Sequence, residues 1–309
     1  MKVKLVVIAG PTACGKTRLG VDLAHRLGSE IVSADSRQVY RGLDIGTGKD
    51  LDEYSRVDPP VPCHLIDLVD PGESFSLYHY QQACYRLLAR KAVEEPFASG
   101  TPLVMVGGTG LYIEAVLRAY RLPNVPEDPA LREALEAEPL EELVRRLEAA
   151  DRELFARTEI ANKRRVIRAL EIAAHGREHE VVYSRGPAVE VDYRVFAVHP
   201  DRAELYRWIG ERVRRRLDEG MIEEVEGLVA AGLDRRRLEW FGMEYRQIAA
   251  YLWGDKSREQ MVEDLEQAIR NLAKRQLTWL RGMGRRGIAV RWIAPGDLET
   301  VLEAVGSWS

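Results

Sequence analysis

The sequence Gly10-Pro-Thr-Ala-Cys-Gly-Lys-Thr17 follows the apolar run Leu5–Ala9 and precedes the amphipathic stretch Arg18–Leu27. It has the form G-x-x-x-x-G-K-[ST], and its setting predicts a strand, a phosphate-binding loop and a helix in succession. The glycines let successive backbone N–H groups turn inward, and the helix N-terminus adds positive potential. Lys16 adds a cation, and the hydroxyl of Thr17 is the predicted Mg²⁺ ligand. The loop therefore predicts a site for a di- or triphosphate, bound by Gly10, Pro11, Thr12, Ala13, Cys14, Gly15, Lys16 and Thr17.

The composition is that of an ordinary soluble protein, with 309 residues, 46% hydrophobic and 30% charged. No apolar run approaches the ~20 residues of a membrane helix, and the N-terminus has no signal-peptide pattern. Cys14, Cys63 and Cys84 lie far apart, without disulfide or zinc spacing. We therefore expect a cytoplasmic protein without membrane contact. The net charge of −4 argues against indiscriminate nucleic-acid binding but leaves room for a local basic face.

The order of predicted elements indicates an α/β fold. Strands and helices alternate over residues 1–120, which predicts a parallel sheet core like that of phosphate-loop (P-loop) NTPases. A polar loop is expected at 50–62, followed by a strand over His64–Val69. A proline-punctuated linker opens a small helical insertion, residues 121–190. Residues 191–309 then complete the core with a strand at 192–198 and helices at 201–219, 221–231, 244–253 and 257–281.

Asp35 ends the short predicted strand Glu30–Asp35. In an open parallel sheet the carboxyl ends of the strands collect ligands, so Asp35 is expected beside the phosphate loop. It can either cap the next turn or take part in catalysis. The buried strand Leu103–Val106 ends in Gly107-Gly-Thr-Gly110. This run permits close approach of a ligand to the backbone but lacks the acidic residue of phosphate-loop hydrolases, which disfavours a simple ATPase.

Basic side chains gather in three stretches. In the insertion, Lys163, Arg164, Arg165 and Arg168 lie within six residues that contain no acid. Such a run forms either a solvated helix face or a contact to a polyanion. The two later stretches contain Arg207, Arg212, Arg214, Arg215 and Arg216, and then Arg270, Lys274, Arg275 and Arg281.

Several motifs together resemble the tRNA dimethylallyltransferase family. They keep their order along most of the chain: the phosphate loop, Ser33-Ala-Asp-Ser-Arg-Gln-Val-Tyr40, Gly42–Thr47, His64–Asp67, Val106–Tyr112 and Leu272–Leu280. The resemblance implies a phosphate-loop core with an inserted helical domain that grips the anticodon stem-loop. It also implies transfer of a dimethylallyl group from dimethylallyl diphosphate to N6 of the adenosine 3′-adjacent to the anticodon. No obligate protein partner is implied.

The resemblance also implies roles for individual residues. Asp35 would be the general base, because an exocyclic adenine amine must lose a proton as it attacks. Lys16, Arg212 and Mg²⁺ held by Thr17 would neutralise the departing diphosphate. Thr12 would contact the substrates. The tRNA contacts implied are Asp35, Ser36, Arg37, Gln38, Thr109, Arg132, Arg164, Arg165 and Arg168.

Two stretches depart from the family pattern, and other functions share parts of it. Gly46-Thr-Gly-Lys49 is followed by Asp50, where the family usually has alanine and proline around the lysine. Trp240–Gln247 differs from the usual isoleucine-glycine-tyrosine pattern. An adenylate isopentenyltransferase uses the same donor with a free nucleotide. A phosphate-loop small-molecule kinase shares residues 10–17. A nucleotide-dependent RNA-binding module without transfer chemistry would need no carboxylate at Asp35.

Overall fold

A six-stranded parallel sheet forms the core of the chain, which a computed structural model describes over residues 2–308. The strands are β1 (Lys2–Ala9), β2 (Ile31–Ser33), β3 (Cys63–His64), β4 (Leu103–Gly107), β5 (Glu190–Val198) and β6 (Val290–Ile293). Their spatial order is β3-β2-β4-β1-β5-β6, and every neighbouring pair is parallel. The predicted α/β fold with a parallel sheet is confirmed.

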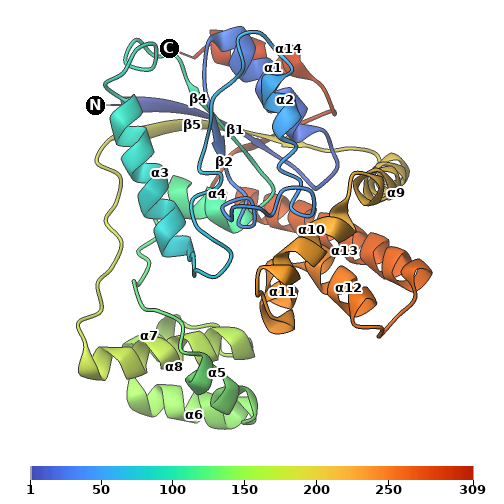
Figure 1. Cartoon of the computed structure of the whole chain (residues 1–309). Helices are drawn as coiled ribbons and strands as arrows, with labels where there is room; N and C mark the ends of the chain where they lie inside the picture. Colours follow the sequence, from blue (N-terminus) through green and yellow to red (C-terminus); the bar gives the residue numbers. More distant parts are fainter. Residues whose placement is uncertain (1, 309) are drawn as a thin grey trace. The chain divides into compact units, whose positions relative to one another are not determined.

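Helices cover both faces of this sheet (Figure 1). Alternate side chains of β1 explain this, because successive residues of a strand point to opposite faces. Val6 and Ile8 join one buried cluster, and Leu5 and Val7 join the other. Within residues 2–308, the sheet and ten helices form one of two compact units of the chain. These helices are α1 (Lys16–Leu27), α2 (Leu51–Ser55), α3 (Leu77–Lys91), α4 (Gly110–Leu117), α9 (Arg202–Asp218), α10 (Met221–Ala230), α11 (Arg235–Phe241), α12 (Met243–Leu252), α13 (Arg258–Arg285) and α14 (Leu298–Gly306).

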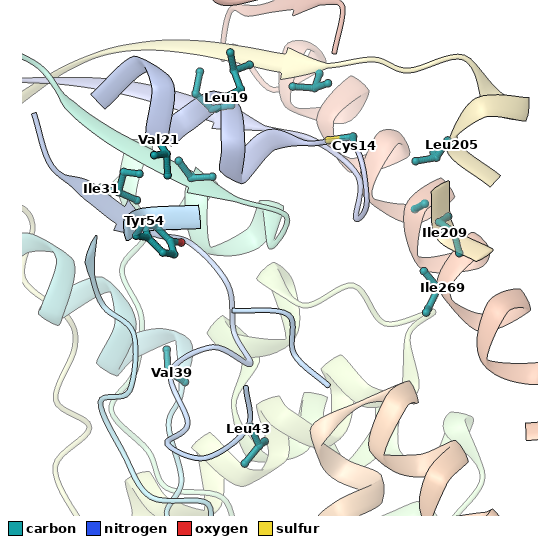
Figure 2. Close-up of a cluster of buried hydrophobic side chains, with 14 of the residues drawn as sticks. Cys14, Leu19, Val21, Ile31, Val39, Leu43, Tyr54, Leu205, Ile209 and Ile269 are labelled. Atoms are coloured by element: carbon teal, nitrogen blue, oxygen red, sulfur yellow. The ribbon is translucent and has the colours of Figure 1, made fainter. Parts of the chain in front are cut away.

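The first of these clusters connects the sheet to the C-terminal helices (Figure 2). It includes Leu19 on α1, Cys14 in the phosphate loop, Ile209 on α9 and Ile269 on α13. Buried apolar contacts therefore hold the phosphate loop and α9 in one core. This packing brings residues about 200 positions apart in the sequence to the same place.

Residues Tyr120–Gly186 form a second compact unit. It contains α5 (Pro129–Glu136), α6 (Leu140–Ala150), α7 (Arg152–Arg157) and α8 (Lys163–Glu178), which enclose a small apolar core of their own. The side chains of Asp128, Asp151 and Asn162 cap the N-termini of α5, α7 and α8. The predicted insertion, residues 121–190, overlaps this unit, and its last residue, Glu190, belongs to β5.

Four local features differ from the predictions. The strand expected over His64–Val69 is limited to β3, because Leu65 (φ 62°) and Asp67 (φ 53°) adopt left-handed backbone angles that end an extended strand. The loop expected at 50–62 contains the short helix α2. Helix α11 was not predicted, and the long C-terminal helix α13 continues to Arg285, four residues beyond its expected end.

Candidate active site

A cleft of about 840 Å³ opens at the carboxyl ends of β1, β2 and β4. Its walls come from the phosphate loop, from the segments after β2 and β4, from residues 47–53, and from α9, α12 and α13. Among the predicted site residues, those that line it are Thr12, Ala13, Gly15, Lys16, Thr17, Asp35, Ser36, Arg37, Thr109 and Arg212. The sequence thus correctly predicted that Asp35 and the phosphate loop lie in one site.

The phosphate loop has the backbone that its glycines predict. Gly15 (φ 79°) and Ala13 (φ 63°) are both left-handed, and α1 starts directly after Gly15. The backbone N–H of Thr12 donates to Gln276 Oε1 (2.8 Å), which anchors the loop to α13. Lys16 Nζ donates to the carbonyl of Pro11 (3.2 Å). Burial, together with the charge of Arg212, lowers the pKa of Lys16, so this ammonium is poorly solvated and suited to an anion.

Asp35 stabilises the turn after β2 with one carboxylate oxygen and keeps the other oxygen free for a bound molecule. Its Oδ1 accepts the backbone N–H of Arg37 (2.9 Å), which stabilises the turn after β2. Within residues 2–308, its Oδ2 has no hydrogen-bond partner. Because Asp35 lines the cleft and is only partly buried, this oxygen can accept a proton from a bound molecule.

The glycine run at the end of β4 lets protein segments approach one another closely. Gly108 and Thr109 also line the cleft, so the close approach of a ligand expected from the sequence stays a prediction. A Cβ on Gly107 would lie 2.2 Å from the carbonyl oxygen of Ala34, and one on Gly110 would lie 2.3 Å from the indole of Trp279. Thr109 extends this contact. Its Oγ1 accepts the N–H of Ser36 (3.1 Å), and its own N–H donates to Ala34 (3.2 Å). The run therefore fixes the segment that carries Asp35.

Arg212 extends from α9 to the phosphate loop. Its Nη1 donates to Thr12 Oγ1 (3.3 Å), and its Nη2 donates to Asp50 Oδ2 (2.5 Å). Arg216, one turn later, donates to Asp50 Oδ1 (3.5 Å). Burial and the charge of Arg216 lower the pKa of Arg212 to about 10, and Asp50 opposes this shift. The cleft thus contains two closely spaced guanidinium groups beside a phosphate loop.

Among the residues that line the cleft, four that take part in its polar contacts were given no site role from the sequence: Asp50, Arg216, Glu244 and Gln276. Glu244, the second residue of α12, lies close to the two arginines, and burial raises the pKa of its carboxyl. Gln276 bridges Thr12 and the carbonyl of Gly108 (3.0 Å). The only available signals were the four-residue spacing of Arg212 and Arg216 on one helix and the departures at Asp50 and Trp240–Gln247. Spacing alone does not pair segments 160–260 residues apart.

The remaining residues after β2 have partners within the protein. Gln38 accepts from Ser33 Oγ (3.0 Å) and donates to the carbonyl of Gly48 (2.9 Å). The guanidinium of Arg37 stacks on the indole of Trp240, 4.5 Å from the ring centroid. Trp240 is 37% exposed. Arg37 therefore presents a flat, ordered cation at the wall of the cleft.

In the second unit, the predicted tRNA-contact residues divide into two groups. Arg132 forms a two-pronged pair with the buried Glu171 (2.7 and 2.8 Å), and Arg168 donates to Glu171 Oε2 (3.1 Å). Arg132 thereby joins α5 to α8, whereas Arg168 and Glu171 both lie on α8. By contrast, Arg164 and Arg165 are exposed. Arg165 pairs with Glu159, while Arg164 has no ion-pair partner among the residues that the structure describes.

Arg132→Met is expected to lower the stability of the second unit by about 1–3 kcal/mol, because it leaves the buried carboxylate of Glu171 under-satisfied. Arg145→Met is the control, since Arg145 forms only an exposed pair with Glu142 on α6. Amide hydrogen exchange in α5 and α8 measures the effect. Unchanged protection together with weaker tRNA binding would instead make Arg132 a tRNA ligand.

The described residues contain neither a membrane-spanning helix nor a cluster of metal-binding side chains. Among residues 2–308, no helix is both long enough and apolar enough to cross a membrane. Over the same range, no group of three or more His, Cys, Asp or Glu side chains could hold a metal ion.

Fold and cleft together define an enzyme of the phosphate-loop class, and comparisons with known proteins specify it further. The family model described as IPP transferase matches residues 38–283, and a model described as isopentenyl transferase matches residues 1–56. tRNA dimethylallyltransferase 1 of Syntrophus aciditrophicus is 47% identical over 304 residues, 98% of this chain and 97% of the relative. The enzyme of the same name from Porphyromonas gingivalis is 44% identical over 289 residues, 94% and 93% of the two chains.

A solved structure agrees with these relatives. The tRNA isopentenylpyrophosphate transferase of Bacillus halodurans superposes with a TM-score of 0.66 at 34% identity, covering 98% of this chain and 94% of its own. The chain therefore belongs to the IPP transferase family. It is a prenyltransferase, which confirms the tRNA dimethylallyltransferase activity predicted from the sequence.

Proposed function

We propose that this chain transfers a dimethylallyl group from dimethylallyl diphosphate to N6 of the adenosine 3′-adjacent to the anticodon in tRNA. The observation that carries this proposal is the meeting of a free carboxylate oxygen, on Asp35, with the phosphate loop and Arg212 in one cleft. A carboxylate and a polyphosphate cradle in the same cleft suit a reaction in which a proton and a diphosphate leave from opposite sides of one new bond.

Asp35 acts on the acceptor. The lone pair of an exocyclic adenine amine is delocalised into the ring, so N6 attacks well only as its proton is removed. N6 forms a bond to C1 of the dimethylallyl group, the bond from C1 to the diphosphate oxygen breaks, and the N6 proton passes to Asp35. The bonding electrons leave with the diphosphate. The base must leave the anticodon-loop stack to reach the cleft.

The phosphate loop and Arg212 act on the leaving group. Backbone N–H groups at the N-terminus of α1 and the ammonium of Lys16 bind the diphosphate. Arg212 adds a fixed cation, whose Nη1 lies 3.3 Å from the hydroxyl of Thr12. These groups already occupy their positions before the carbon–oxygen bond breaks, so they stabilise the developing charge without reorganisation.

Mg²⁺ is the proposed cofactor, with Thr17 as its protein ligand. Thr17 lies in the first turn of α1 and lines the cleft. Mg²⁺ commonly takes one or two protein oxygens, substrate phosphate oxygens and several waters, so a single hydroxyl fits this role. When bound, the ion would neutralise part of the diphosphate charge.

The acceptor accounts for the basic residues outside the phosphate loop. Ser36, Arg37, Gln38 and Thr109 form the proposed contacts at the target nucleotide, and Arg164 and Arg165 those at the anticodon stem. A tRNA acceptor makes the cytoplasm the proposed location of the reaction. The protein needs no protein partner for this chemistry.

Arg164→Glu is expected to weaken tRNA binding and to flatten its dependence on salt concentration, because each lost phosphate contact lowers the number of released counterions by about one. Binding measured between low and physiological salt tests this. Arg152→Glu, at another exposed position of the same unit, controls for net charge. An unchanged salt slope for Arg164→Glu would remove α8 from the tRNA contact.

One labelling experiment separates this function from its rivals. The protein is incubated with Mg²⁺, isotopically labelled dimethylallyl diphosphate, and either unmodified tRNA or AMP. We expect label on tRNA and none on AMP. Label on AMP alone would indicate an adenylate isopentenyltransferase, and label on neither would favour a kinase or a binding module.

A further inference from the structure

Asp50 lies between the two buried arginines of the cleft and contacts each with a different oxygen. Oδ2 accepts from Arg212 (2.5 Å) and Oδ1 from Arg216 (3.5 Å). The side chains of Arg212, Arg216 and Asp50 are only 19%, 7% and 26% exposed. Two guanidinium groups this close repel each other unless an anion lies between them. Asp50 supplies that anion.

The local structure at Asp50 suggests that its carboxylate has a task other than capping. Asp50 is the N-cap residue of α2, a position where aspartate usually accepts an N–H from the first turn. Here the side chain of Asp50 makes no capping hydrogen bond, and its backbone has a left-handed conformation (φ 47°). Its carboxylate contacts α9 instead.

The loop that leads into Asp50 is held by hydrogen bonds to α10 and to the segment after β3. Glu224 on α10 accepts the N–H groups of Asp44, Ile45 and Gly46 (2.6–3.0 Å). Lys49 is fully buried and donates to the carbonyl of Tyr40 (2.8 Å), to Asp44 (2.5 Å) and to Asp67. These bonds hold residues 44–49, directly before Asp50, to other parts of the protein, so the backbone that leads into Asp50 is fixed.

We propose that Asp50 is the positioning residue of this reaction: it offsets the charge of Arg216 and holds Arg212 against Thr12, where Arg212 meets the departing diphosphate. This inference rests on the role proposed above for Arg212. Asp50 itself touches neither the donor nor the acceptor. It acts by fixing a cation at the place where negative charge develops, and a misplacement of about 1 Å at such a group can cost about 10²-fold in rate.

The charge balance around Arg212 gives this role a signature in pH. Arg216 and Arg215 on α9 and Lys16 in the phosphate loop disfavour its cation, while Asp50 and, on α12, Glu244 favour it. Arg212 is charged below its folded-state pKa and loses its charge as pH rises through it. Removal of Asp50 lowers that pKa, so the alkaline loss of activity moves to lower pH.

Asp50→Asn tests the proposal, because asparagine keeps the size of the side chain and removes its charge. We expect kcat to fall by about 10- to 100-fold and the alkaline limb of the rate profile to move to lower pH. Affinity for inorganic diphosphate, measured by calorimetry in Mg²⁺ buffer, should stay equal or rise, because the cleft becomes more positive. Asp52→Asn, an exposed change two residues away, should leave all three quantities unchanged.

The double variant Asp50→Asn/Arg216→Met removes the anion together with the cation that it offsets. We expect its alkaline limb to return toward that of the unmodified protein, and this variant also serves if Asp50→Asn alone does not fold. Parallel losses of kcat and diphosphate affinity, or an unmoved alkaline limb, would overturn the proposal. Arg212→Ala distinguishes failure of the role proposed for Arg212 from failure of the role proposed for Asp50. If Arg212→Ala keeps full activity, the role of Arg212 is refuted. If Arg212→Ala loses activity and Asp50→Asn does not, only the role of Asp50 is refuted.

Discussion

Asp35→Ala lowers the rate of dimethylallyl transfer by about 10²–10⁴-fold, the usual effect of losing a general base, while binding of dimethylallyl diphosphate stays near normal. The reason is geometric as well as chemical. Asp35 lines the cleft with the phosphate loop, but none of the bonds that the structure gives it involves that loop. Single-turnover transfer to tRNA and equilibrium binding of the donor measure the two effects separately.

Asp35→Asn distinguishes the two roles that Asp35 can have. The amide oxygen of asparagine can still accept the N–H of Arg37, so the turn after β2 is retained, but the side chain no longer takes up a proton. We expect Asp35→Asn to be as slow as Asp35→Ala. Recovery of the full rate with asparagine would mean that Asp35 only stabilises the turn, and would contradict its role as base.

Arg212→Ala is expected to lower the transfer rate by about 10²–10³-fold, the scale found when one fixed donor to a developing anion is removed. Loss of the guanidinium leaves the diphosphate with Lys16 and the loop amides, while the proton acceptor Asp35 is unaffected. The rate of diphosphate release in a single turnover measures this step directly.

Arg214→Ala is the matched control on the same helix. Arg214 is 68% exposed and pairs only with Glu266 (3.4 Å). We expect its rate to stay within about twofold of the unmodified protein, because surface pairs of this kind contribute little. Equal rates for Arg212→Ala and Arg214→Ala would show that Arg212 does not act on the leaving group.

The sequence allowed correct prediction of those parts of the molecule that depend on local pattern. A glycine-rich loop between an apolar run and an amphipathic helix is compatible with few structures other than a strand, a phosphate-binding loop and a helix. Asp35, which follows a strand, was correctly expected beside this loop. The strand expected at His64–Val69 failed because Leu65 and Asp67 adopt left-handed angles. Asp67 accepts a hydrogen bond from the buried Lys49, so a tertiary contact accompanies the left-handed backbone at this position.

The rest of the site depends on contacts between distant segments. Gln276 meets Thr12, and Arg212 meets Asp50, only because α9 and α13 pack on the same apolar cluster as α1. No spacing in the sequence encodes these meetings. Similarly, the four cations of residues 163–168 read as one basic face, yet Arg168 and the distant Arg132 share the buried Glu171. Burial of a single carboxylate decides which arginines remain available.

One measurement tests the central claim, that the cleft couples proton removal by Asp35 to departure of diphosphate. The protein is loaded with labelled dimethylallyl diphosphate and mixed with excess unmodified tRNA, and both released diphosphate and N6-modified adenosine are followed in a single turnover. We expect equal amounts of the two products, with the modification on the adenosine 3′-adjacent to the anticodon, and neither product on this timescale from Asp35→Asn. Modification by Asp35→Asn at the unmodified rate would contradict it.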